Sequence, residues 1–238
     1  MTKIGLSTGG AIAAAVIGAA VLIGAGWPGA AVLLAFFIPS TLLSRAGRAK
    51  KRALVDIGKQ GPRDAWQVLA NGGVAALAIL LSLRYGPPLL AAFAGAFAAA
   101  SADTWATEIG TLSKRAPRSI LTMKPLPTGI SGGVTAQGSL AQVVGALVVA
   151  VVASLVHVAP LWPVLLGGIA GSIADSILGA TLQALRYCPR CARNCETNPH
   201  ACGTPTVMRR GVRGFDNDAV NFAATSCGAV VALIAVIL

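Results

Sequence analysis

Carboxylates are scarce in this sequence, and most of them lie in or beside long apolar segments. Asp and Glu together supply only 8 of the 238 residues. Asp103 and Asp175 fall inside apolar segments, and Glu108 falls at the end of one. Because an ionisable side chain in a membrane span is costly and usually serves a function, these acids are candidate functional groups.

A second group of oxygen donors, Asp216-Asn217-Asp218 with Asn221 one turn later, precedes the last apolar segment. Clustered carboxylates are hard ligands, which magnesium binds together with substrate phosphates and water. Asp103 and Glu108 lie about 140° apart around a helix, so their side chains cannot both point at one spot. We therefore expect Asp103 and Asp175 to point into one cavity, with Glu108 at its mouth. The predicted magnesium ligands are Asp103, Glu108, Asp175, Asp216 and Asp218, and Asp103, Asp175 and Asp218 are the candidate catalytic residues. The alternatives are helix capping within 216–218 and pairing of the two deep acids with a buried Arg.

The segment 117–135 combines two cations, several hydroxyl residues and three glycines ahead of an apolar segment. A Gly-rich turn at a helix N-terminus presents backbone N–H groups to anions, so this segment is a candidate phosphate site. The Gly-Lys-[Ser/Thr] sequence of a Walker A loop is missing, and a basic loop beside anionic lipid is the alternative. With a second basic patch at 209–214, the candidate substrate- and phosphate-binding residues are Asn71, Arg118, Lys124, Thr128, Gly132, Gly133, Arg210, Arg213, Asn217 and Asn221.

Four cysteines and one histidine lie together in the polar segment 186–217. A Cys-x2-Cys pair followed by His-x-Cys supplies four soft ligands, which suit tetrahedral zinc, and four protein ligands make such a site structural. In a reducing cytosol disulfides are not expected, and free thiols or redox chemistry are the alternatives. The predicted zinc ligands are Cys188, Cys191, His200 and Cys202, with Cys195 as an alternative ligand.

The composition identifies the bilayer as the solvent of this chain. Hydrophobic residues make up 55 % and charged residues 11 %, against about 25 % charged in soluble domains. A soluble enzyme and a disordered chain are therefore both excluded. The sequence predicts an all-α polytopic membrane protein, a single transmembrane domain over 1–238 with the Cys-rich loop 186–217 inserted between its last two spans. The seven predicted spans are 7–25, 28–44, 66–84, 88–108, 137–157, 161–185 and 218–238.

The basic residues fall on one side of these spans. With alternating spans, all of the 19 Lys and Arg residues except Arg84 lie on the same side, which the positive-inside rule assigns to the cytoplasm together with the N-terminus. The net charge of +11 is therefore explained by membrane topology, and we expect no nucleic-acid partner. Pro88 and Pro160 each precede an acid by fifteen residues. The likeness of these two segments suggests three related helical hairpins and a closing helix, although a similar Ala- and Gly-rich composition alone would also explain it. Asp175 is expected about ten residues from the cytoplasmic end of its span, roughly 15 Å at helical rise.

The chain resembles the integral-membrane family that includes plant phytyl-phosphate kinase and animal transmembrane protein nineteen. The likeness covers nearly the whole chain and rests on the segments 63–73, 102–110, 132–134, 175–183 and 216–222 and on the Cys-x2-Cys loop. One departure is Ile130-Ser131, where the family often has Thr-Asn, so those side-chain contacts are not carried over. The resemblance implies a kinase that uses a nucleotide triphosphate, expected to be CTP, and converts an isoprenyl monophosphate of the phytyl or geranylgeranyl type to its diphosphate.

Two other functions fit the same residues. A nucleotidyltransferase that forms a CDP-lipid would use the same carboxylates, and a transporter of a lipid or phosphorylated metabolite would also carry midplane acids. The polar groups crowd toward the predicted cytoplasmic side, which favours an enzyme over a two-sided pathway. We expect an integral protein of a prokaryotic plasma membrane, with magnesium as cofactor, a nucleotide and a prenyl phosphate as partners, and an active site facing the cytoplasm.

Overall fold

Long apolar helices make up most of the chain, as a computed structural model describes it for residues 5–46 and 61–238. The helices are α1 (Thr8–Arg45), α3 (Ala65–Tyr85), α4 (Pro88–Gly110), α5 (Ala136–Leu155), α6 (Leu161–Thr181) and α7 (Asn217–Ile237). All six are long and apolar enough to cross a membrane. The predicted class, an all-α polytopic membrane protein, is therefore confirmed.

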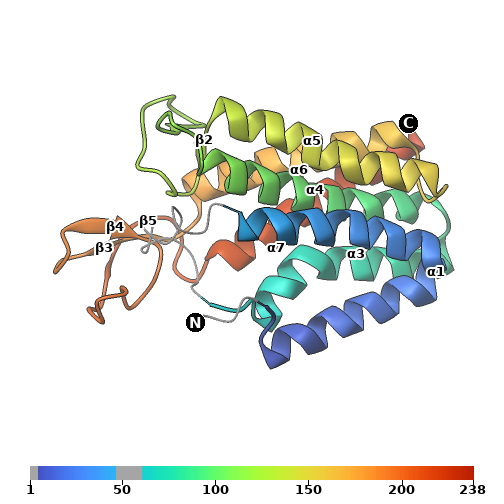
Figure 1. The fold of residues 1–238 in the computed structure, drawn as a ribbon, viewed down its shortest axis with the longest axis horizontal. Coiled ribbons are helices and arrows are strands. Elements are labelled where there is room, and N and C mark those ends of the chain that lie inside the picture. Colours follow the sequence, from blue (N-terminus) through green and yellow to red (C-terminus); the bar gives the residue numbers. More distant parts are fainter. Residues whose placement is uncertain (1–4, 47–60) are drawn as a thin grey trace.

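The helix α1 accounts for the first two predicted spans. Gly26 interrupts it with φ 57° and ψ −145°, a conformation that a residue with a side chain rarely adopts. The chain turns back at this point, and the two arms run in opposite directions in Figure 1. Six helices with one folded back agree with the expectation of about seven spans.

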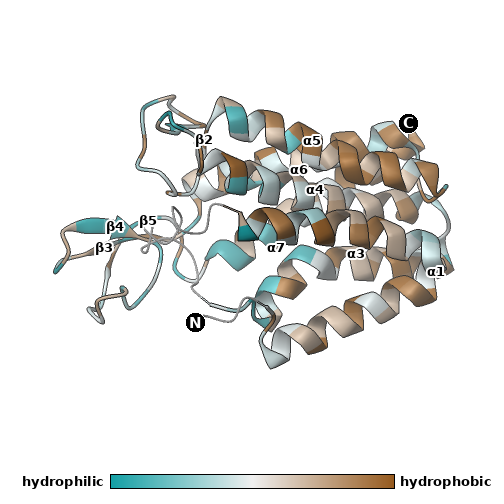
Figure 2. Ribbon diagram, in the orientation of Figure 1, coloured by the Kyte–Doolittle hydropathy of each residue, from teal (hydrophilic) through white to brown (hydrophobic). Residues whose placement is uncertain are grey.

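The long loops before α5 and before α7 lie at one end of the bundle, where they form two small sheets. One sheet pairs β1 (Arg118–Ser119) with β2 (Gly133–Val134), and the other has the antiparallel order β4-β3-β5. Its strands are β3 (Leu185–Cys188), β4 (Arg193–Cys195) and β5 (Val207–Arg210). Figure 2 contrasts these hydrophilic loops with the apolar helices. The sequence analysis did not predict these strands, which are only two to four residues long.

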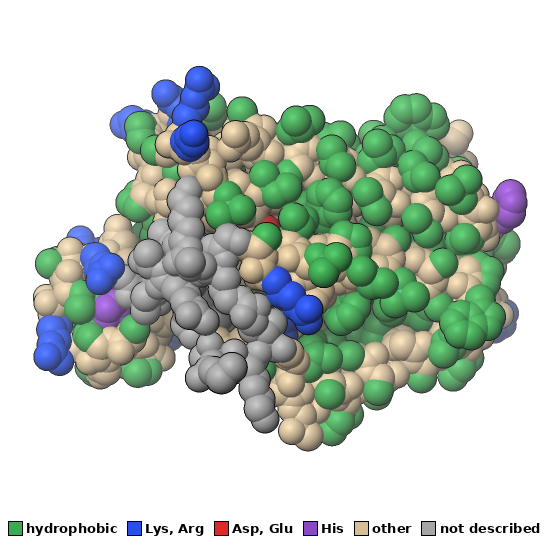
Figure 3. Space-filling view, viewed as in Figure 1, with side chains coloured by type: hydrophobic (Ala, Val, Ile, Leu, Met, Phe, Trp, Pro, Cys, Tyr) green, Lys and Arg blue, Asp and Glu red, His purple; other side chains and the backbone are tan. Residues whose placement is uncertain are grey.

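Basic side chains gather at the end of the bundle that carries the loops, as Figure 3 shows for the face in view. The helix α1 begins at this end and α7 ends at the opposite one (Figure 1). This arrangement matches the grouping of basic loops that the sequence predicts. Most of the first basic loop, residues 47–60, lies outside the described residues, and the cytoplasmic orientation stays a prediction from the positive-inside rule.

The helix α4 is the centre of the bundle. Every residue from Ala91 to Ala102 is buried, and most of them are alanines. Glycines of the neighbouring helices make the close approach possible: a Cβ added at Gly171 of α6 would lie 2.4 Å from the Ala99 Cβ, and one at Gly228 of α7 would lie 2.6 Å from it. Small residues at helix contacts are how membrane helices gain packing energy, because lipid supplies no hydrophobic drive between them.

The end of α6 differs from the prediction. The last turn closes with hydrogen bonds from the Leu182 and Gln183 N–H groups to the Leu178 carbonyl, and the chain then enters β3 at Leu185. The predicted span therefore overran the helix by four residues. Asp175 lies six residues from the helix end, about 9 Å at helical rise instead of roughly 15 Å.

The packing of α7 on α4 gives the first testable prediction. Gly228→Leu should lower the thermal stability of the detergent-purified protein strongly, because its Cβ would also lie 2.8 Å from the Gly95 carbonyl oxygen and 3.0 Å from that of Gly167. Overpacking of this kind typically costs about 1–3 kcal/mol. Gly18→Leu is the matched control, because nothing lies within 4 Å of a Cβ at that position. Equal melting temperatures for the two variants would show that the contact is not tight.

Candidate functional site

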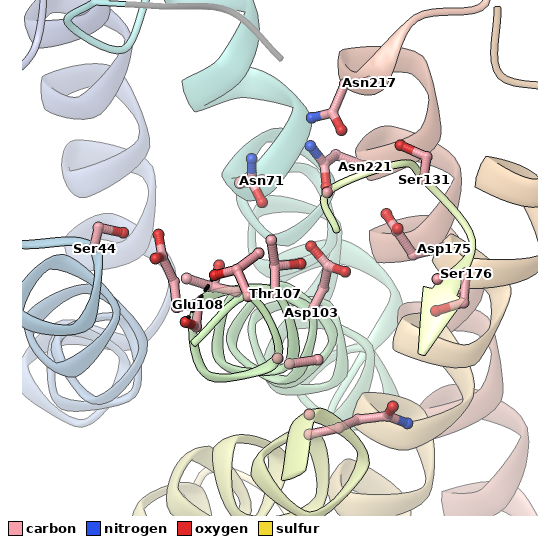
Figure 4. Close-up of a pocket in the computed structure, with 18 of the residues that line it drawn as sticks. Ser44, Asn71, Asp103, Thr107, Glu108, Ser131, Asp175, Ser176, Asn217 and Asn221 are labelled. Atoms are coloured by element: carbon pink, nitrogen blue, oxygen red, sulfur yellow. Dashed lines mark hydrogen bonds between the residues drawn. The ribbon is translucent and has the colours of Figure 1, made fainter. Parts of the chain in front are cut away.

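A polar cavity of about 710 Å³ opens into the bundle at the end that carries the loops. Its walls come from all six helices, and the Gly-rich segment before α5 closes one side. The side chains of these elements converge on the same space in Figure 4. Among the predicted site residues, the cavity is lined by Asn71, Asp103, Glu108, Thr128, Gly132, Gly133, Asp175, Asn217 and Asn221.

Asp103 of α4 and Asp175 of α6 face one another in this cavity (Figure 4). Their carboxyl groups are close enough to interact directly. Two adjacent carboxylates repel each other unless a cation or a shared proton separates them. Among the described residues no Lys or Arg pairs with either acid, so the pairing with a buried Arg that the sequence left open is not found there. The pair is a candidate site for a divalent cation.

Two asparagines border the same space from α3 and α7. Asn71 donates its amide to the Gln67 carbonyl at 2.9 Å, within α3, and Asn221 lies one turn after Asn217 at the start of α7. Figure 4 shows Asn71 and Asn221 close to the acid pair. Gln67 closes a capping box with Asp64 and so fixes the start of α3.

Glu108 lines the cavity on its other side, toward Ser44 of α1 (Figure 4). This placement agrees with the expected angular separation from Asp103. Arg45 and Arg63 also line this side, and the Arg63 guanidinium donates to the Ser44 hydroxyl at 3.2 Å. Burial lowers the pKa of Arg63 from its usual value, although an arginine stays protonated in proteins. The sequence analysis missed both cations as site residues, because it counted them only as part of a basic loop.

The Gly-rich segment lies directly on the end of α6. Gly132 has φ +83°, and a Cβ there would lie 2.5 Å from the Ala180 Cβ, so only glycine fits. The N–H of Gly133 donates to the Ile130 carbonyl and the N–H of Ser131 donates to Glu196. These two N–H groups are therefore occupied within the protein, which limits the phosphate cradle predicted from the sequence to the rest of the loop.

Glu196 is a cavity residue that the sequence analysis did not single out. Its Oε1 accepts from the Ser131 N–H at 3.0 Å, and its Oε2 accepts from the Gln183 side-chain amide at 3.0 Å. Burial raises the pKa of Glu196, while the hydrogen bonds from Ser131 and the charge of Arg210 oppose that rise. Its carboxylate also lies close enough to Asp175 for the two charges to interact.

Several predicted site residues lie outside the cavity lining. Arg118 donates to the Met123 carbonyl of its own loop, and Arg210 donates to the Gly179 carbonyl at the end of α6. Asp216 caps α7 by accepting from the N–H groups of Asp218 and Ala219, so the capping alternative describes its side chain. The predicted residues that do not line the cavity are Arg118, Lys124, Arg210, Arg213, Asp216 and Asp218.

The predicted zinc ligands come together at the tip of the extramembrane sheet. One ligand atom from each of Cys188, Cys191, His200 and Cys202 lies within 4.8 Å of all the others. The Sγ atoms of Cys188 and Cys202 are 3.6 Å apart, and zinc–ligand bonds of about 2.0–2.3 Å place tetrahedral neighbours roughly 3.3–3.8 Å apart. The cluster is therefore compatible with a structural zinc ion. Cys195 does not belong to it.

The thiols of this cluster are electrostatically unequal. Hydrogen bonding with Thr204 and then with His200 lowers the pKa of Cys202 to about 5. Hydrogen bonding with Cys202 raises the pKa of Cys191 to about 11. A thiolate at Cys202 beside two further thiols and an imidazole is a donor set that favours a soft divalent metal.

Comparison with known proteins places the chain among membrane proteins. Residues 1–229 match the family described as Integral membrane protein DUF92. The chain belongs to this family. Its relatives include Protein PGR of Arabidopsis thaliana, 33 % identical with 83 % of this chain and 78 % of the relative covered. An uncharacterized membrane protein of Methanocaldococcus jannaschii is 35 % identical, with 75 % of each chain covered.

A third relative is an uncharacterized membrane protein of Synechocystis, 30 % identical with 71 % of this chain and 68 % of the relative covered. No solved structure matches the chain. The family match confirms an integral membrane protein with prokaryotic relatives. The chemistry of the cavity therefore has to be argued from its residues.

The Cys/His cluster gives the second prediction. Protein purified without chelator should carry about one zinc per chain, measured by inductively coupled plasma mass spectrometry. Replacing Cys188 and Cys191 together by Ser should remove the metal, because two of its four ligands are lost. Cys195→Ala is the matched control, a buried cysteine of the same sheet outside the cluster, and should retain the zinc. Zinc-free wild-type protein would refute the assignment.

Proposed function

We propose that this protein is a magnesium-dependent kinase that transfers the terminal phosphoryl group of a nucleoside triphosphate, CTP by resemblance to the plant kinase, to an isoprenyl monophosphate. The observation that carries the proposal is the pair of facing carboxylates, Asp103 and Asp175, at the base of a polar cavity within apolar helices. Such a cavity can bring a polar phosphate headgroup to the acids while its hydrocarbon chain stays in the bilayer.

The acid pair supports a metal–phosphate site. Magnesium binds in proteins through one or two carboxylates and completes its shell with substrate phosphates and water. Asp103 and Asp175 would hold it, and Asn71 and Asn221 supply amide groups at the border of the same space. Bound magnesium would neutralise the two carboxylates and could still coordinate phosphate oxygens.

The cations on the opposite wall support a second phosphate position. Arg63 and Arg45 line the cavity on the α1 side, with the Thr41 and Ser44 hydroxyls beside them. Arginine binds phosphate through charge-assisted hydrogen bonds. A kinase whose acceptor is itself a phosphate needs room for two anionic substrates, and the two walls offer it.

The reaction needs no covalent nucleophile from the protein. An oxygen of the prenyl monophosphate forms a bond to the terminal phosphorus, and the bond from that phosphorus to the bridging oxygen breaks, which releases the nucleoside diphosphate. The acceptor oxygen is already ionised at neutral pH, so a general base is not required. Catalysis is then a matter of positioning and charge neutralisation, which an acid pair, arginines and amides can provide.

The experiment that tests the proposal is product analysis. Purified protein is incubated with CTP, magnesium and geranylgeranyl or phytyl monophosphate, and the products are identified by mass spectrometry. Formation of CDP and the prenyl diphosphate would support the kinase. Release of pyrophosphate with a CDP-lipid would instead support a nucleotidyltransferase, and no turnover with any prenyl phosphate would count against both.

The third prediction separates chemistry from folding. Asp103→Asn and Asp175→Asn should each lower turnover at least about 100-fold, about 2.7 kcal/mol in the activation barrier, because each removes one ligand charge. Their melting temperatures should not fall, since neutralising one of two facing carboxylates removes repulsion. Asp64→Asn is the matched control and should keep the turnover and melting temperature of the wild type, because Asn caps a helix as well as Asp does. Normal turnover in both cavity variants would contradict the metal site, and loss of folding in both would make the acids structural.

A further inference from the structure

Glu196 connects the extramembrane sheet to the Gly-rich loop of the cavity. Its two carboxylate oxygens accept separately, one from the Ser131 N–H and one from the Gln183 amide, each at 3.0 Å. Ser131 belongs to the loop before α5, and Gln183 follows the end of α6. A single side chain therefore joins its own segment to one that lies 13 residues before it and to one that lies 65 residues before it.

The sheet places Glu196 and the Cys/His cluster at opposite ends. Cys195, the residue before Glu196, pairs with Arg186, next to the end of α6, whereas Cys188 pairs with Arg193 at the far end. After Glu196 the chain returns to the far end, where His200 and Cys202 meet Cys188. The segment that carries Glu196 is thus anchored by β4 on one side and by the cluster on the other.

We propose that a soft divalent metal ion, zinc by the chemistry of its ligands, binds at the Cys/His cluster and holds Glu196 in place, and that Glu196 is a positioning residue that fixes the Gly-rich loop over the cavity. The proposal concerns the order of this loop. It holds whatever reaction the cavity performs, so its failure is distinct from failure of the kinase assignment.

The extramembrane sheet is too small to hold its position by packing alone. Its strands have three or four residues, and exposed side chains such as Arg193, Asn194 and Val207 cover much of it. Small sheets without a hydrophobic face are marginal in water, and small units of this kind commonly depend on a structural metal. Without the metal, the turn between β3 and β4 and the segment after Glu196 would no longer be joined at the cluster. The segment that contains Glu196 would then lose one of its two anchors.

The Gly-rich loop depends in turn on Glu196. Gly132, the residue after the bonded Ser131, lies against Ala180 of α6 with no room for a side chain. Glu196 joins the loop to Gln183, just beyond that same helix end. Without this carboxylate the Ser131 N–H loses its partner, and the loop loses a clamp beside its contact with α6.

The fourth prediction uses hydrogen–deuterium exchange of the peptide that spans residues 128–135. In detergent-purified wild-type protein, removal of zinc with a chelator should speed exchange of this peptide about fivefold, the scale of one lost hydrogen bond, and added zinc should restore it. Glu196→Ala should give the same acceleration while retaining zinc. Glu196→Gln should exchange as the wild type does, because its amide oxygen still accepts from Ser131 and the Gln183 amide can rotate to pair with it.

Asn194→Ala is the matched control, an exposed side chain on β4 two residues before Glu196, and should leave both exchange and zinc content unchanged. Unchanged exchange in Glu196→Ala, or after zinc removal, would overturn the proposal. Exchange in Glu196→Gln as fast as in Glu196→Ala would also overturn it, because charge and not the hydrogen bond would then matter. If chelation unfolds the bundle, the zinc-loaded Glu196→Ala protein decides alone.

Discussion

The close packing of α4 against α6 and α7 is the constraint on which the cavity depends. The backbones at Gly171 of α6 and Gly228 of α7 pack directly against the Ala99 side chain of α4. Asp103 follows Ala99 by about one helical turn and Asp175 follows Gly171 by about one turn, so the same contact positions the two carboxylates. A larger residue at the contact would separate the two carboxylates and change what they could bind together. The apolar packing thus sets the geometry of the polar site.

The loops that complete the cavity also pack against the helices through glycines, which allow close contact. Gly132 meets Ala180, and a Cβ at Gly211 would lie 2.1 Å from the Gln183 carbonyl oxygen. Both contacts are made at the end of α6, close to Asp175. The Arg210 side chain, which the sequence suggested for phosphate, instead donates to the Gly179 carbonyl. Helix ends leave carbonyl groups without intrahelical partners, so a basic side chain there serves the fold.

The helices were predictable from sequence because hydrophobicity and length determine a membrane span. The acids were predictable because a carboxylate inside an apolar segment stands out. The error at the end of α6 arose because Leu182, Ala184 and Leu185 are as apolar as a span, although they form a turn and a strand. Asp216 left two interpretations open, because a helix cap and a metal ligand require the same side chain. Glu196 could not have been found, since its partner Ser131 lies 65 residues away and no local pattern marks the pair.

The distribution of charge explains why the cavity would depend on a cation from solution. The arginines that line it stand on the α1 side with Glu108, while Asp103 and Asp175 face each other with Glu196 nearby. Two like charges in a site of low dielectric repel strongly. An arginine between them would cancel that repulsion permanently and leave no reason for a divalent ion or a phosphate to enter. Under the proposed function, an acid pair without such a partner attracts magnesium, and the bound ion then takes phosphate oxygens into its remaining coordination positions.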